Sequence, residues 1–121
     1  MVSTSREIEP VESETLQRIV ERGQVWPKMA AKYGVENPVP PWKTSLDGLC
    51  DALDQASCGS VAPDFAQRRD EEDALSASVY AALPYPESQL MSLAHSLMVR
   101  GIITEPELRQ RLDAVRARLE A

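Results

Sequence analysis

Residues 84–121 read PYPESQLMSLAHSLMVRGIITEPELRQRLDAVRARLEA, and this stretch decides the fold. Its first half predicts a helix that starts at Pro86 and stops at Gly101, with a broad apolar stripe of Leu90, Met91, Leu93, Ala94, Leu97 and Met98. Thr104-Glu105-Pro106-Glu107 is a capping box for a final helix. That helix repeats its apolar residues in steps of four, three and four, at Leu108, Leu112, Val115 and Leu119. The short link between the two helices predicts an antiparallel αα-hairpin.

The preceding residues predict shorter helices that glycine and proline separate. One covers roughly Ser13–Arg22 before Gly23, and a second lies near Pro27–Tyr33 before Gly34. Thr44 or Ser45 can cap a third helix that ends near residues 57–59, and Pro63 opens a charged fourth helix over residues 64–75. No segment alternates apolar and polar residues long enough to predict a strand. The expected class is all-α, a small helical domain with a C-terminal antiparallel αα-hairpin.

A proline-rich connector divides this arrangement. Residues 37–41 read NPVPP, and three prolines in four residues exclude a helix and favour an extended chain. We therefore expect an extended N-terminal arm with short helices over residues 1–41 and a helical domain over residues 42–121. The arm has little core of its own, so its aromatic residues are expected to anchor in another subunit.

Composition limits the classes of function. The 121 residues suit one domain, and 19 acidic against 13 basic residues give a formal charge of −6. This charge argues against nucleic acid and anionic membranes as partners. No apolar run approaches the roughly 20 residues of a membrane span, and the first residues lack the features of an export signal. We expect a cytoplasmic protein in which Cys50 and Cys58 are reduced.

Few residues could carry catalysis. His95 is the single histidine, and the spacing of Cys50 and Cys58 matches no standard zinc, redox or iron–sulfur motif. The sequence has no phosphate-binding loop, no GxSxG and no HExxH. We expect no metal or cofactor site in this chain. A non-catalytic subunit that works when docked against a partner fits these absences best.

Two arginine-bearing segments remain. Arg68 and Arg69 precede the acidic run of residues 70–73, where they could form helical ion pairs of about 0.2–0.5 kcal/mol each. Alternatively, one of them could enter a partner's site, since the planar guanidinium binds oxygen ligands well. The last helix is also rich in arginine, but residues 100–121 carry five arginines against four acids. The resulting charge of +1 disfavours DNA binding by this segment.

Residues 65–119 carry these features in a distinctive order: an arginine pair, a Val-Tyr step, a Leu-Pro-Tyr step into an apolar helix, and a Thr-x-x-Glu-Leu box before an arginine-bearing helix. In this order they resemble the N-terminal helical region of nitrile hydratase beta subunits. The nearest resemblance is to the separate beta subunit of thiocyanate hydrolase, from the same superfamily. Trp42, Leu46 and Cys50 extend the match weakly, and residues 1–40 lie outside it. The chain departs from the family after Tyr85, where Pro86, Glu87 and Gln89 stand in a segment that usually holds Tyr or Trp.

The resemblance implies a beta-type subunit of a complex that hydrates a C≡N group to an amide. Co(III) or Fe(III) would be held by a cysteine claw in the partner alpha subunit, and a third, beta-barrel-like subunit would complete the complex. Arg68 or Arg69 matches the family's arginine that hydrogen-bonds the oxidised cysteines of the claw. Aliphatic nitriles, a nitrile-bearing nucleoside and thiocyanate are all compatible substrates. The expected partner-interface residues are Trp26, Tyr33, Trp42, Tyr80, Tyr85, Met91, His95 and Met98.

Two other functions fit the same residues. One is an accessory protein of the same superfamily that delivers metal to the alpha subunit or activates it, although such proteins tend to carry a metal-binding tail. The other is a helical interaction module unrelated to hydratases, with the hairpin over residues 86–119 as its docking surface.

Overall fold

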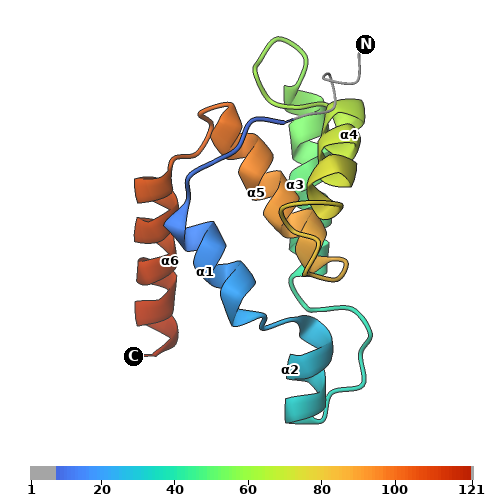
Figure 1. Ribbon diagram of the computed structural model, residues 1–121, viewed down its shortest axis with the longest axis vertical. Helices are drawn as coiled ribbons and strands as arrows, with labels where there is room; N and C mark the ends of the chain where they lie inside the picture. Colours follow the sequence, from blue (N-terminus) through green and yellow to red (C-terminus); the bar gives the residue numbers. More distant parts are fainter. Residues whose placement is uncertain (1–7, 121) are drawn as a thin grey trace.

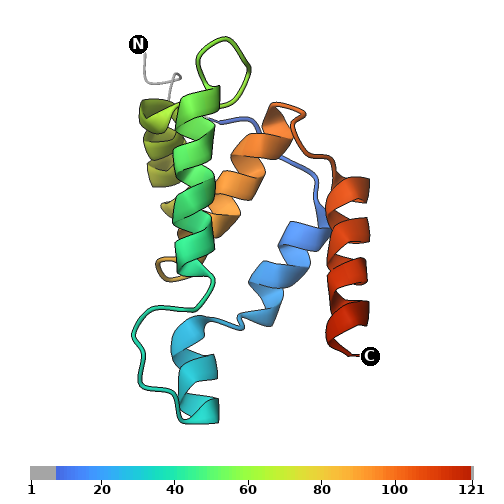
Figure 2. The ribbon, with the colours of Figure 1, turned by 180° about the vertical axis from the view of Figure 1, so that it is seen from behind.

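The computed structural model describes residues 8–120, which form six α-helices (Figures 1 and 2). Within this range there is no strand, so the expected all-α class is confirmed. None of the described helices combines the length and the apolar character needed to cross a bilayer. The helices are α1 (Glu14–Arg22), α2 (Trp26–Tyr33), α3 (Lys43–Ala56), α4 (Phe65–Ser76), α5 (Glu87–Val99) and α6 (Glu105–Leu119).

Local signals set most helix ends. Gly23 and Gly34 adopt the left-handed conformation that ends α1 and α2, with φ of 58° and 69°. The capping box before α6 is present, since Thr104 accepts from the Glu107 N–H and the Glu107 side chain accepts from the Thr104 N–H. The start of α3 differs from the prediction, because Thr44 and Ser45 lie inside its first turn.

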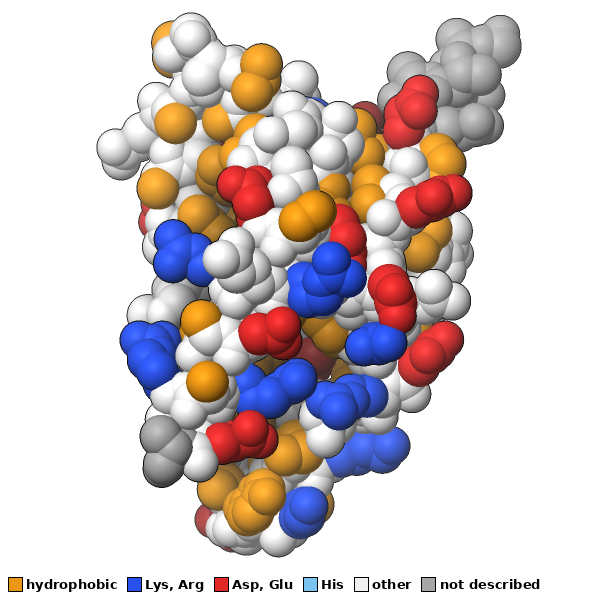
Figure 3. Space-filling model, turned by 90° about the vertical axis from the view of Figure 1, so that its left-hand side faces the viewer, with side chains coloured by type: hydrophobic (Ala, Val, Ile, Leu, Met, Phe, Trp, Pro, Cys, Tyr) orange, Lys and Arg blue, Asp and Glu red, His pale blue; other side chains and the backbone are white. Residues whose placement is uncertain are grey.

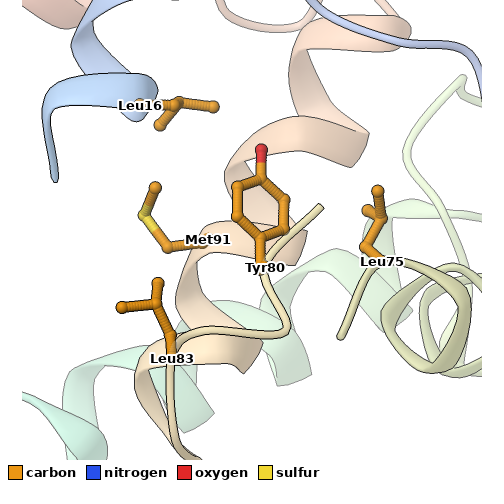
Figure 4. Close-up of a cluster of buried hydrophobic side chains, with 5 residues drawn as sticks. All are labelled: Leu16, Leu75, Tyr80, Leu83 and Met91. Carbon is orange, nitrogen blue, oxygen red and sulfur yellow. The ribbon is translucent and has the colours of Figure 1, made fainter. Parts of the chain in front are cut away.

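Helix α5 lies at the centre of the core. One hydrophobic cluster gathers side chains from α1, α4, the segment after α4, and α5, as Figure 4 shows; its buried members are Leu16, Leu75, Tyr80, Leu83 and Met91. A second cluster joins α3 to α5 through Leu46, Leu93 and Leu97. Because apolar residues of α5 contribute to both clusters, this helix holds the others together.

An ion pair also joins α4 to α5. The Arg100 guanidinium, at the end of α5, donates through Nη1 and Nη2 to the two carboxylate oxygens of Glu71, over 2.8 and 2.6 Å. Both side chains are largely buried. This bidentate contact therefore helps to fix the orientation of α4 relative to α5, in addition to their apolar packing.

The expected hairpin of the last two helices is not confirmed. Helix α6 packs chiefly against α1, while α5 packs against α4 (Figure 1). No residue of α6 is buried, and only Leu108 among its apolar residues joins the first cluster. The carboxylate of Glu105 instead holds α6 to the start of α1, where it accepts from the hydroxyl of Ser13 and from the hydroxyl and N–H of Thr15.

Residues before the proline connector also pack on the rest of the chain. Leu16 of α1 is buried in the first cluster, and Ile8, Val20 and Val25 pack against it. His95 on α5 donates from Nε2 to the carbonyl of Glu9. Residues 1–7 of the expected arm lie outside the described residues, and the division at residue 41 stays a prediction.

Candidate functional site

A cleft of about 590 Å³ lies between α3, α4 and α5, and the predicted arginine pair forms part of its wall. Its lining is mainly polar, with an apolar contribution from Phe65 and Leu93. The lining residues are Asp47, Cys50, Asp51 and Asp54 of α3; Phe65, Arg68, Arg69, Glu72 and Asp73 of α4; Tyr85; and Gln89, Leu93 and Ser96 of α5.

Arg68 is fixed in this wall. Its Nη1 donates to Oδ1 of Asp54 over 2.7 Å and to the carbonyl of Pro63 over 3.2 Å, and only 11% of the side chain is exposed. Burial opposes the charge of Arg68, but the hydrogen bond to Asp54, the charge of Asp54 and a smaller effect of Cys50 together outweigh burial, and the pKa of Arg68 is raised. The same bond lowers the pKa of Asp54. Both of these hydrogen bonds come from Nη1, and the guanidinium also interacts with the Cys50 side chain, which still leaves N–H groups that can donate to further oxygen atoms.

Arg69 lies next to Arg68 but in a different environment. Its side chain is 65% exposed, and its Nε is 3.7 Å from the carboxylate of Asp73 one turn later. Such an exposed pair contributes little to stability and holds the side chain weakly. Of the two predicted arginines, only Arg68 is therefore held in position by the fold.

The cleft is acidic despite its arginines. Five carboxylates line it against two guanidinium groups, a net of −3. Burial, with a smaller effect of Asp73, raises the pKa of Glu72. Burial also raises the pKa of the Cys50 thiol, so this cysteine is not activated as a nucleophile at neutral pH. A free anion is disfavoured here, whereas a neutral ligand or a partner's hydrogen-bonding group is not.

His95 does not lie in this cleft. It is 2% exposed in the core, where Nε2 donates to the Glu9 carbonyl and Nδ1 is 2.8 Å from the Tyr80 hydroxyl. Burial raises the pKa of Tyr80 to about 12, so its hydroxyl keeps its proton at neutral pH. Both ring nitrogens are therefore engaged in the chain's own hydrogen bonds. Within residues 8–120, moreover, no three His, Cys, Asp or Glu side chains are arranged to hold a metal ion.

The predicted interface residues divide by exposure. Tyr33 and Tyr85 are 66% and 64% exposed, and the Lys43 ammonium lies 5.3 Å from the centre of the Tyr85 ring. Tyr80, Met91 and His95 are instead buried inside the chain. Tyr80 and Met91 belong to the first cluster and His95 is hydrogen-bonded to Tyr80, so these three belong to the core and not to the exposed surface that a partner can reach.

The remaining three predicted interface residues are half-buried. Trp26 donates its backbone N–H to Glu87 and its indole N–H to the carbonyl of Asn37. Trp42 packs against the second cluster, and Met98 packs against the first. Each leaves part of its side chain at the surface.

Sequence reasoning missed two residues of the cleft. Asp54 pairs with Arg68 across fourteen residues of sequence, a spacing without a local signal. Gln89 contributes to the lining, and its Oε1 atom is buried without a hydrogen-bond donor among the described residues. The only sequence signal for Gln89 was that it departs from the family pattern.

Comparisons with protein-family models, with curated proteins and with solved structures found no match to this chain.

Proposed function

We propose that this chain is a non-catalytic, beta-type subunit of a cytoplasmic nitrile hydratase-type complex. The complex would hydrate a C≡N group to an amide, and this chain would form one wall of the shared site. The main support for the proposal is Arg68. The fold holds its side chain in the wall of the cleft, and its guanidinium keeps N–H groups that can donate to a partner.

Arg68 is suited to bind oxygen atoms that another subunit presents. Asp54 and the Pro63 carbonyl orient one edge of its guanidinium, which limits the rotamer freedom that would be lost on binding. The remaining N–H groups can donate to a planar or paired set of oxygen acceptors, as the oxidised cysteines of a metal claw would present. Asp54 thus serves as a positioning residue for Arg68.

The charge of the cleft bears on the substrate. A lining with a net charge of −3 disfavours the thiocyanate anion and is compatible with a neutral nitrile. We therefore propose a nitrile and not thiocyanate as the substrate class.

The metal of such a complex would belong to the alpha-type partner. Within residues 8–120 no three His, Cys, Asp or Glu side chains are grouped to hold a metal ion, and the proposal assigns the metal to the partner. Co(III) or Fe(III) in the partner's claw would supply Lewis-acid activation of the nitrile. This chain would contribute hydrogen bonds, the cleft wall and buried interface.

Co-expression with the neighbouring open reading frames tests the proposal. Native mass and metal analysis of the purified complex should show this chain, a cysteine-claw subunit, a third beta-barrel-like subunit, and stoichiometric cobalt or iron. A folded chain that copurifies with no metal-bearing subunit would overturn the proposal and favour an interaction module. Copurification only during maturation of the alpha subunit, and not in the mature enzyme, would favour the accessory role.

Substitution of the arginines then tests the site. We expect Arg68→Ala to lower kcat for nitrile hydration by about 100-fold, the scale of losing one preorganised donor at an active site. Arg69→Ala is the matched control on the next residue, and we expect a change of less than about threefold. Equal effects of the two substitutions, or no effect of Arg68→Ala in a complex with full metal content, would contradict the role of Arg68.

A further inference from the structure

Helix α6 presents an apolar stripe that the other described residues, within 8–120, leave largely uncovered. Its first member, Leu108, packs on the core, but Leu112, Val115 and Leu119 are 38%, 39% and 81% exposed. Exposure thus increases toward the C-terminal end of the helix, as α6 extends beyond its contact with α1 (Figures 1 and 2). We call Leu112, Val115 and Leu119, with their flanking arginines, the α6 face.

Arginines flank this stripe on both sides. Residues seven apart lie on nearly the same side of a helix, so Arg109 and Arg116 form one flank and Arg111 and Arg118 form the other. The acids of α6 could neutralise them through ion pairs one turn away. Within residues 8–120, however, none of these four arginines forms an ion pair.

Charge is unevenly distributed between the two groups of helices. Helices α1, α2 and α6 carry eight basic and five acidic residues, a net of +3, whereas α3, α4 and α5 carry three basic and eight acidic residues, a net of −5. Figure 3 shows the side of the molecule where α6 lies. Lys and Arg side chains gather over the middle and lower parts of this view, with hydrophobic side chains between them.

We infer that the α6 face binds an amphipathic helix of a partner protein, with acidic side chains on both sides of its own apolar stripe. Apolar contact would cover Leu112, Val115 and Leu119, and the arginines on each flank would pair with the partner's carboxylates. Charge complementarity selects this occupant. A second copy in parallel would set arginine against arginine, which is unfavourable. An antiparallel copy could pair Arg116 and Arg118 with Glu105 and Glu107, so self-association is tested separately below.

The inference does not depend on nitrile hydration, because the cleft with Arg68 is lined by α3, α4, Tyr85 and α5, and not by α6. A protein partner is favoured over an anionic membrane because α6 has no aromatic residue to insert at a lipid interface.

The experiment uses the full chain and a labelled synthetic helix of three heptads, with Leu at a and d and Glu at e and g. Fluorescence anisotropy at low salt should show saturable binding that weakens at least tenfold at high salt. The same peptide with Lys at e and g is the control and should bind at least tenfold more weakly. Equal binding of the two peptides, or binding of neither, would overturn the inference.

Variants locate the binding face. Arg111→Glu with Arg118→Glu, and separately Leu112→Gln with Val115→Gln, should each weaken binding of the Glu peptide about tenfold or more. Leu90→Gln, at an equally exposed leucine on α5, is the control and should bind as the unmodified chain does. Circular dichroism should show the same helicity for all variants, since the substituted side chains are exposed. Variants that bind as tightly as the unmodified chain would overturn the inference.

Two further measurements test whether the α6 face binds an anionic membrane or a second copy of this chain instead. Sedimentation with phosphatidylserine vesicles tests the membrane, and sedimentation equilibrium of the free chain tests self-association. We expect a monomer that does not sediment with vesicles. If the chain bound vesicles and the Arg111→Glu, Arg118→Glu variant did not, the α6 face would bind a membrane and not a partner helix. If the chain formed a dimer and the Leu112→Gln, Val115→Gln variant did not, the α6 face would bind a second copy of this chain.

Discussion

Glu105 shows how one side chain can place a helix. Its carboxylate accepts hydrogen bonds from Ser13 and Thr15, and these groups sit at the N-terminal end of α1, where the helix dipole also favours negative charge. Burial alone would raise the pKa of Glu105, but the hydrogen bonds outweigh burial and the pKa is lowered. The ionised form is thus favoured in the folded chain.

This depressed pKa predicts a pH-dependent contribution to stability. A carboxyl whose pKa falls on folding stabilises the fold above its ordinary value, here 4.5, and loses that contribution as the pH falls through its folded value. We expect Glu105→Gln to lower the free energy of unfolding by about 1–2 kcal/mol near neutral pH. The difference from the unmodified chain should shrink below pH 4.5.

Urea unfolding of both chains over a range of pH measures this difference. Glu120→Gln, near the exposed end of α6, serves as the control and should leave stability within about 0.5 kcal/mol at every pH. A difference for Glu105→Gln that stays constant as the pH falls would show that the ionised carboxylate is not the stabilising species.

At the scale of elements, helix starts with a local signal were predictable and those without one were not. The box at Thr104 lies within four residues of sequence and was identified directly. Thr44 or Ser45 was predicted as the cap, but α3 begins at Lys43, after a turn in which the Lys43 N–H donates to the Pro40 carbonyl. The N-cap of α3 is Trp42, whose side chain makes no cap hydrogen bond.

The contrast between Thr104, which caps α6, and Thr44, which caps no helix, gives a prediction for two substitutions. Thr104→Ala should lower the free energy of unfolding by about 1 kcal/mol, because it leaves an N–H group at the start of α6 without its acceptor. Thr44→Ala should change it by less than about 0.5 kcal/mol, since Thr44 is exposed and makes no cap. Thermal or urea unfolding of the two variants checks both values. Equal losses would mean that Thr44 acts as a cap after all.

Contacts between elements were less predictable than the elements themselves. Two consecutive apolar helices favoured a hairpin, but α6 is held to α1 by Glu105 and Ser13, which are 92 residues apart. Arg68 was singled out from sequence, whereas Asp54, which positions it, is identified only by the hydrogen bond that joins α4 to α3 in the folded chain. Periodicity identifies an apolar face but carries no information about which helix covers it.

At the scale of the whole molecule, the two hydrophobic clusters raise the question of how the chain unfolds. The first cluster includes Leu16 of α1, before the proline connector, and the second includes Leu46 of α3, after it. Both clusters use residues of α5. If α5 transmits the loss of one cluster to the other, the chain unfolds as one unit and the sequence-based boundary at residue 41 does not separate two folding units.

The substitution Leu16→Ala tests this coupling. We expect it to lower the free energy of unfolding by about 2–4 kcal/mol, because it empties a buried site in the first cluster. In a Trp26→Phe background the remaining tryptophan, Trp42, reports on the second cluster. The Trp42 fluorescence transition and the far-ultraviolet circular dichroism transition should coincide and shift together. Leu90→Ala, at an exposed site of α5, should shift neither by more than about 0.5 kcal/mol. If Leu16→Ala left the Trp42 transition unchanged, residues before the connector would form a separate unit, and their packing on α5 would contribute nothing to the stability of the remaining helices.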